Sequence, residues 1–118
     1  MTHSLAQLSR PTQLGYREIT PSNLARADFR GRIIDVREPV EFHHESGHLA
    51  GAELVPLATV AEQANRWDRD TEFVMVCRSG ARSGRAAQLL ASMGFRQLYN
   101  LTGGMLAHVA EGLPTVRS

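Results

Sequence analysis

The sequence predicts an α/β sandwich with a mostly parallel sheet. Short segments rich in β-branched and aromatic residues alternate with segments of helical periodicity. The connections between them are short, and this alternation is typical of a parallel sheet with helices packed against it. At 118 residues the chain has the length of one domain with one core. We expect a flexible lead-in at residues 1–15 and a single domain at residues 16–118.

Five segments have the composition of strands. They are residues 16–19, 32–36, 52–55, 73–76 and 97–99. The fourth is an uninterrupted apolar run, which predicts a buried strand, whereas the fifth is the weakest of the set.

Five helices are predicted between these strands. They cover about residues 21–27, 39–45, 59–67, 83–93 and 104–111. Pro21 and Pro39 fit the first turn of the first two helices, where proline is favoured. The fourth helix is the clearest, because apolar residues recur at three- and four-residue spacing before Gly94. Gly112 ends the last helix in the same way.

Charge and hydropathy exclude several partners. All 13 basic residues are arginine and 12 residues are acidic, so a net charge of +1 provides no field for nucleic acid. No apolar run approaches the roughly 20 residues that span a bilayer, and the N-terminus lacks the apolar stretch of an export signal. We therefore expect a cytoplasmic protein without a membrane or nucleic-acid partner.

The chain has one cysteine, Cys77, and no lysine. An internal disulfide, a Cys-x-x-Cys redox pair and a cysteine-rich zinc site are therefore excluded, as are lysine Schiff bases and the Gly-Lys phosphate loop. His44 and His48 are four residues apart, but Gly47 interrupts the helix and no further ligand is suitably spaced. We expect neither a metal nor a cofactor.

Cys77 directly follows the apolar segment 73–76, and ligands of open α/β sheets bind at the carboxyl ends of strands. The loop after it consists of Arg78, Ser79, Gly80, Ala81 and Arg82, and the next helix begins near Ser83. Inward N–H groups and the helix start would lower the thiol pKa, and the two arginines add positive charge. We expect an exposed, negatively charged sulfur. The alternative is a buried cysteine that acts only as a small hydrophobe.

Asp35 is a carboxylate in an otherwise apolar strand. We expect it to reach the same edge of the sheet, where it would hold an arginine or loop N–H groups; a purely structural ion pair is an equal alternative. Arg37 and Glu41 are four residues apart, which favours a local ion pair between them.

Four motifs in this order resemble those of the rhodanese homology domain. They are residues 34–38 (IDVRE) with 41–42 (EF), residues 47–52 (GHLAGA), residues 77–83 (CRSGARS) and residues 103–105 (GGM). The resemblance covers about residues 16–115. It implies a three-layer sandwich with a five-stranded, mostly parallel sheet flanked by helices. It also implies that His48 is structural and bonds to backbone groups.

The resemblance implies a sulfurtransferase without a cofactor. Cys77 would take a sulfane sulfur from thiosulfate or a similar donor, hold it as a persulfide, and pass it to cyanide, a thiol or a protein acceptor. Arg78 and Arg82 would bind the donor's sulfonate oxygens or steady the persulfide. The other loop residues, Ser79, Gly80 and Ala81, would hold it through N–H groups, supported by Ser83 and Asp35. We expect a monomer or weak homodimer.

Loop length separates the two branches of the family. Arg82 is the sixth residue counted from Cys77, as in the sulfurtransferases, whereas the related phosphatases have a loop one residue longer, with arginine where this chain has Ser83. A phosphatase or arsenate reductase, and a noncatalytic interaction or sulfur-carrier module, are the alternatives. His108 stands where the family commonly has tryptophan, which indicates a changed packing or a changed substrate mouth.

Overall fold

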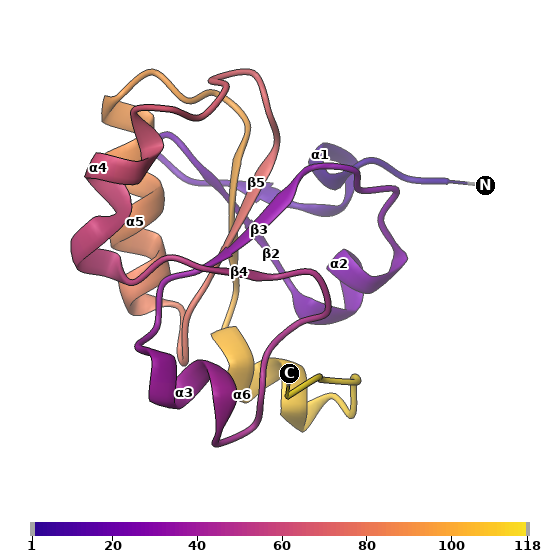
Figure 1. The fold of residues 1–118 in the computed structure, drawn as a ribbon. Helices are drawn as coiled ribbons and strands as arrows, with labels where there is room; N and C mark the ends of the chain where they lie inside the picture. The colour runs from indigo at the N-terminus through magenta and orange to yellow at the C-terminus, as the bar shows by residue number, and fades with distance from the viewer. Residues whose placement is uncertain (1, 118) are drawn as a thin grey trace.

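The computed structural model describes residues 2–117 (Figure 1). Its strands are β1 (Arg10–Pro11), β2 (Arg17–Ile19), β3 (Arg32–Asp35), β4 (Glu53–Leu54), β5 (Phe73–Val76) and β6 (Leu98–Leu101). Its helices are α1 (Leu5–Leu8), α2 (Pro21–Arg26), α3 (Pro39–His43), the 3₁₀ helix η1 (Leu57–Thr59), α4 (Val60–Ala64), α5 (Ala81–Ser92) and α6 (Gly104–Ala110).

The strands form one sheet in the order β1-β2-β6-β5-β3-β4. Every neighbouring pair is parallel except β1 and β2, which are antiparallel. Helices α4 and α5 cover one face and α1 and α2 the other, so the fold has three layers (Figure 1). The predicted α/β class is confirmed. The sheet has six strands in the described residues rather than the five expected, because β1 is added at its edge.

The added strand comes from the N-terminal residues. Ser4 caps α1 in a capping box with Gln7, and each side chain accepts a hydrogen bond from the other residue's backbone N–H. Leu5 is completely buried, and Arg10 pairs with Glu18 of β2. Residues 4–11, which belong to the expected lead-in, therefore pack against the rest of the sheet.

Two apolar clusters occupy the two sides of the sheet. One lies between the sheet and α4 and α5 and contains the stacked rings of Trp67 and Phe73, with Phe95 packed edge-on against both. The other contains Leu5, Leu101 and Met105 on the side of α1 and α2. Strand β5 contributes to both clusters and is buried along its whole length, as its apolar sequence predicts.

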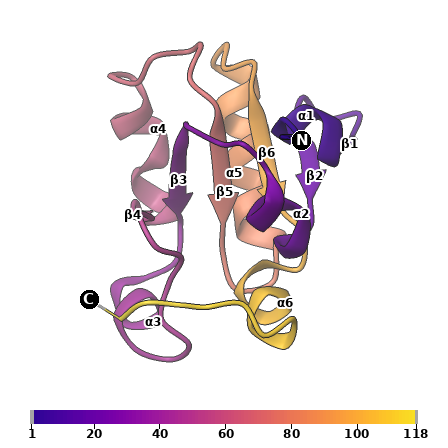
Figure 2. The same cartoon turned by 90° about the vertical axis from the view of Figure 1, so that its right-hand side faces the viewer.

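The carboxyl ends of the central strands meet at one end of the molecule. Figure 2 shows β3 and β5 pointing toward the end where α3 and α6 lie. Cys77 follows β5 there, and Asp35 is the last residue of β3. Within residues 2–117, no helix has the length and apolarity that crossing a membrane requires.

Candidate active site

Cys77 is the first residue of the short loop that joins β5 to α5. The backbone N–H of Gly80 donates a hydrogen bond to its Sγ at 3.1 Å, and Oγ of Ser83 lies 3.3 Å from Sγ. The residue is only 1% exposed. The sequence predicted an exposed sulfur, and this expectation is wrong, because the loop residues and the elements around them close over Cys77.

The environment lowers the pKa of the Cys77 thiol. Burial by itself raises this pKa, since it disfavours the charged form. Hydrogen bonds from the Ser83 side chain and from the N–H groups of Ser83, Gly80 and Ser79 act in the opposite direction and outweigh burial. The loop therefore favours negative charge on Sγ, although Cys77 is as buried as a hydrophobic core residue.

Gly80 gives the loop its shape. Its φ of +99° lies in the left-handed region that glycine adopts most readily, and it is the N-cap of α5. Its carbonyl accepts the N–H of Gly84 at 3.0 Å, so α5 begins at Ala81, two residues before the predicted start near Ser83. Ala81 and Arg82 consequently belong to the first helical turn rather than to the loop.

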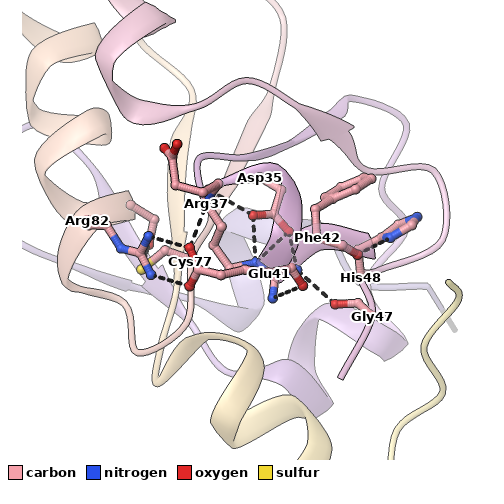
Figure 3. Close-up of polar contacts among 10 residues, drawn as sticks. Asp35, Arg37, Glu41, Phe42, Gly47, His48, Cys77 and Arg82 are labelled. Carbon is pink, nitrogen blue, oxygen red and sulfur yellow. Dashed lines mark hydrogen bonds and ion pairs between the residues drawn. The ribbon is translucent and has the colours of Figure 1, made fainter. Parts of the chain in front are cut away.

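Arg82 is held by a carboxylate from a different element. Its guanidinium donates two hydrogen bonds to Glu41 of α3, at 2.8 and 2.7 Å (Figure 3). The hydrogen bonds from Arg82 lower the pKa of Glu41 to about 2, and the same contact raises the pKa of Arg82, with a further contribution from the charge of Cys77. The predicted local pair of Arg37 with Glu41 is wrong, because Glu41 reaches across the site.

Arg37 instead pairs with Asp35, and both side chains are completely buried. Nε and Nη2 of Arg37 donate to the carboxylate at 2.8 to 3.1 Å, and Nη2 also donates to the carbonyl of Gly47 at 2.8 Å (Figure 3). Asp35 therefore forms a buried ion pair with Arg37, which is the structural alternative that the sequence left open. The pair fixes the segment that carries Glu41, whose carbonyl accepts from Nη1 of Arg37 at 3.2 Å.

His48 has the structural role that the family resemblance implied. Its Nδ1 lies 3.0 Å from the carbonyl oxygen of Phe42, and the two rings are stacked with centroids 3.7 Å apart (Figure 3). Its backbone also exchanges hydrogen bonds with Val116. In residues 2–117, no group of three or more histidine, cysteine or acidic side chains is arranged to hold a metal ion.

Sequence reasoning missed Asn100, a buried residue of β6. Its Oδ1 accepts a hydrogen bond from the Ser83 hydroxyl at 2.6 Å, and its Nδ2 donates to Glu18 at 3.0 Å and to the carbonyl of Gly80 at 3.1 Å. The available signal was the same as for Asp35: a polar residue interrupts an apolar strand near its carboxyl end.

Helix α6 is hydrogen-bonded to the backbone of the Cys77 loop. The N–H groups of Met105 and Leu106 donate to the carbonyls of Cys77 and Arg78 at 2.9 and 3.0 Å. His108 of the same helix is buried, and its Nε2 lies 2.8 Å from the carbonyl of Pro114. It lines a cavity of about 320 Å³ to which none of residues 77–83 contributes, and this placement favours a packing change over a changed substrate mouth.

The family model of the rhodanese-like domain matches residues 20–111. The chain belongs to this family, as the resemblance of its four motifs indicated. Its six-stranded, mostly parallel sheet with flanking helices is also that of solved rhodanese-like proteins.

Three relatives illustrate the similarity. The YqhL protein of Bacillus subtilis is 44% identical over 80 residues, which are 67% of this chain and 62% of YqhL, so the chain spans less than two thirds of that relative. A protein of Allochromatium vinosum named sulfurtransferase is 33% identical over 84 residues, 71% of this chain and 77% of the relative. A rhodanese-related protein of Thermoplasma volcanium superposes with a TM-score of 0.79 at 28% identity, covering 87% of this chain and all of that structure.

Proposed function

We propose that this chain is a thiosulfate sulfurtransferase that carries a sulfane sulfur as a persulfide on Cys77. One observation supports the proposal above all others: the sulfur lies among hydrogen-bond donors that lower the thiol pKa. A thiolate, and not a thiol, is the nucleophile that sulfur transfer requires. No histidine base is needed, since the loop itself favours the ionised form.

The reaction is a double displacement. The Cys77 thiolate attacks the outer sulfur of thiosulfate and forms a sulfur–sulfur bond, while the sulfur–sulfur bond of thiosulfate breaks and its electron pair leaves with sulfite. The outer sulfur of the resulting persulfide carries the negative charge, which the N–H groups of Ser79 and Gly80 would stabilise. Cyanide or a thiol then attacks that outer sulfur and bonds to it, while the bond between Sγ and the outer sulfur breaks and its electron pair stays on Sγ, which restores the thiolate.

The two arginines have different parts in this proposal. Arg78 is exposed at the start of the loop, where it can meet the sulfonate oxygens of an incoming donor. Arg82 is engaged by Glu41, so a donor anion reaches it only in competition with that carboxylate. Since Cys77 is buried, a donor contacts Sγ only when residues around the sulfur move.

The test is to incubate the purified protein with thiosulfate and measure its intact mass. We expect a gain of one sulfur atom that disappears with cyanide, with release of thiocyanate, and that never forms in Cys77→Ser. Turnover of an aryl phosphate or arsenate faster than thiosulfate would instead indicate the chemistry of the related phosphatases. Absence of the mass gain with thiosulfate and with an alkyl persulfide would contradict the proposal.

A further inference from the structure

Ser83 stands between the sulfur of Cys77 and the side chain of Asn100. Its Oγ lies 3.3 Å from Sγ and 2.6 Å from Oδ1 of Asn100. Ser83 and Asn100 are 0% and 3% exposed, so bulk water does not supply further hydrogen bonds to them. A hydroxyl group has a single proton to donate. Ser83 can therefore donate to the sulfur or to the amide oxygen, but not fully to both.

The amide of Asn100 has only one consistent orientation. Its Nδ2 lies 3.0 Å from Oε2 of Glu18 and 3.1 Å from the carbonyl oxygen of Gly80. A carboxylate and a carbonyl are both acceptors, so the group that faces them must be the NH₂. Oδ1 consequently faces Ser83 as an acceptor, and its 2.6 Å separation is shorter than the usual hydroxyl hydrogen bond.

We propose that Asn100 is a positioning residue that holds the hydroxyl proton of Ser83 away from the sulfur of Cys77. In the thiol form the S–H donates to Ser83, which donates to Asn100, and each group has a partner. In the thiolate form Ser83 must turn its proton to the sulfur, which leaves the lone pairs of its Oγ and of Oδ1 facing each other. Asn100 thus disfavours the thiolate form of Cys77, whereas the loop N–H groups favour that form.

The consequence for sulfur transfer rests on the proposed function. In the persulfide, Sγ is bonded to the transferred sulfur and the negative charge lies on the outer atom. Sγ then needs no proton from Ser83, and the hydrogen bond from Ser83 to Asn100 stays intact. Asn100 therefore favours the two states in which Sγ is uncharged, the thiol and the persulfide, over the free thiolate. Asn100 therefore shifts the equilibrium between thiolate and persulfide toward the persulfide.

The first experiment follows the ionisation of Cys77 by the pH dependence of its alkylation, without any sulfur donor. Asn100→Ala should lower the thiol pKa and increase the thiolate fraction at pH 7 several-fold, about tenfold at most. Ser83→Ala alone should raise the thiol pKa, because it removes a hydroxyl whose hydrogen bond to the sulfur lowers that pKa. The double variant should match Ser83→Ala, because without the hydroxyl Asn100 has no proton to hold away from the sulfur.

Thr102→Val is the matched control. Thr102 donates to Oε1 of Glu18 at 2.7 Å, in the same network, but no hydrogen bond joins it to Ser83. If any disruption of this hydrogen-bond network changed the thiol pKa, Thr102→Val would change the pH profile of alkylation as well. We expect the profile of Thr102→Val to match that of the wild type. Asn100→Leu, which fills the site without an acceptor, replaces Asn100→Ala if that variant does not fold. An unchanged or raised thiol pKa on loss of the amide overturns the proposal.

The second experiment measures loading. In a fixed mixture of thiosulfate and sulfite, at a pH above the thiol pKa of the wild type, intact mass gives the ratio of persulfide to unloaded, mainly thiolate protein. We expect this ratio to fall several-fold in Asn100→Ala and to stay unchanged in Thr102→Val. Failure of the wild type to load would contradict the proposed function, while the alkylation profiles would still decide the role of Asn100. Normal loading ratios in all variants would refute the bias toward the loaded sulfur.

Discussion

Two arginines near Cys77 differ in their surroundings although both pair with carboxylates. Arg37 is completely buried with Asp35, whereas the side chain of Arg82 is 30% exposed beside Glu41. Solvent does not reach the buried pair, and this pair fixes the backbone around it. The Arg82 pair is partly exposed, so the proposed anionic donor would compete with Glu41 for the guanidinium. The sequence placed Arg82 at the site and paired Arg37 with Glu41, so it assigned Glu41 to the wrong arginine.

The Glu41 contact predicts a pH dependence of stability. The folded-state pKa of Glu41 is depressed from its ordinary value to about 2, so its contribution is present above about pH 4.5 and is lost as the pH falls toward 2. Glu41→Gln should lower the free energy of unfolding at pH 7 by about 1–2 kcal/mol, after allowance for solvent screening. Urea unfolding at several pH values measures this difference.

The difference between wild type and Glu41→Gln should shrink as the pH falls from about 4.5 to 2, since the wild type loses its ion pair there. Glu62→Gln provides a control, because Glu62 is exposed on α4 away from the site. A difference that stays constant through this pH range would show that Glu41 acts by packing and not by charge.

At the scale of elements, the loop depends on α6 as much as on its own helix. Gly104, the first residue of α6, has a φ of +59° and lies directly against the loop backbone. A Cβ atom there would lie 2.5 Å from the carbonyl oxygen of Cys77 and 2.6 Å from that of Arg78. Backbone atoms cannot swing away as a flexible side chain does. The glycine pair at residues 103–104 therefore allows α6 to approach the active-site loop.

Gly104→Ala should consequently destabilise the protein by about 2–4 kcal/mol and raise the thiol pKa of Cys77, because the loop must shift. Gly112→Ala is the matched control. Its φ of +73° imposes a similar backbone cost, but a Cβ there meets nothing within 4 Å, so a loss of only about 1 kcal/mol is expected. Thermal unfolding and alkylation rates measure both effects. Equal losses of stability in the two variants would contradict the close contact.

The sequence predicts the parts of the site that depend on local order. Cys77 at the end of an apolar strand, a glycine three residues later and a helix beyond them are sufficient to predict an anion-binding loop. Partners distant in sequence are not predictable in this way. Glu41 lies 41 residues from Arg82 but only four from Arg37, so spacing favours the wrong partner. The contacts of the loop with Asn100 and α6 join segments that local patterns do not bring together. Strand β1 has too few residues to produce a periodic signal.

For the whole molecule, the Asp35–Arg37 pair joins the end of the central strand β3 to the segment that ends at Gly47. Breaking a completely buried pair leaves an uncompensated charge in the core. Asp35→Ala should therefore lower the free energy of unfolding by about 3–5 kcal/mol. Chemical denaturation is the measurement.

Glu53→Gln tests whether this cost comes from burial. Glu53 also makes two hydrogen bonds with an arginine, Arg32, at 2.9 and 2.8 Å, but the two side chains are 43% and 35% exposed. An exposed pair contributes less than about 1 kcal/mol. Comparable losses for Asp35→Ala and Glu53→Gln would refute a special role of the buried pair.

Ionisation of the Cys77 thiol is the property on which the proposed sulfur transfer depends. Its most direct measurement is the titration of the thiolate's ultraviolet absorbance in the wild type, with Cys77→Ser as the blank. We predict a midpoint below about 8.5, the ordinary value for cysteine, because the donors of Ser83, Gly80 and Ser79 outweigh burial. A midpoint at or above that value would mean that burial prevails and that Cys77 is an inert core residue.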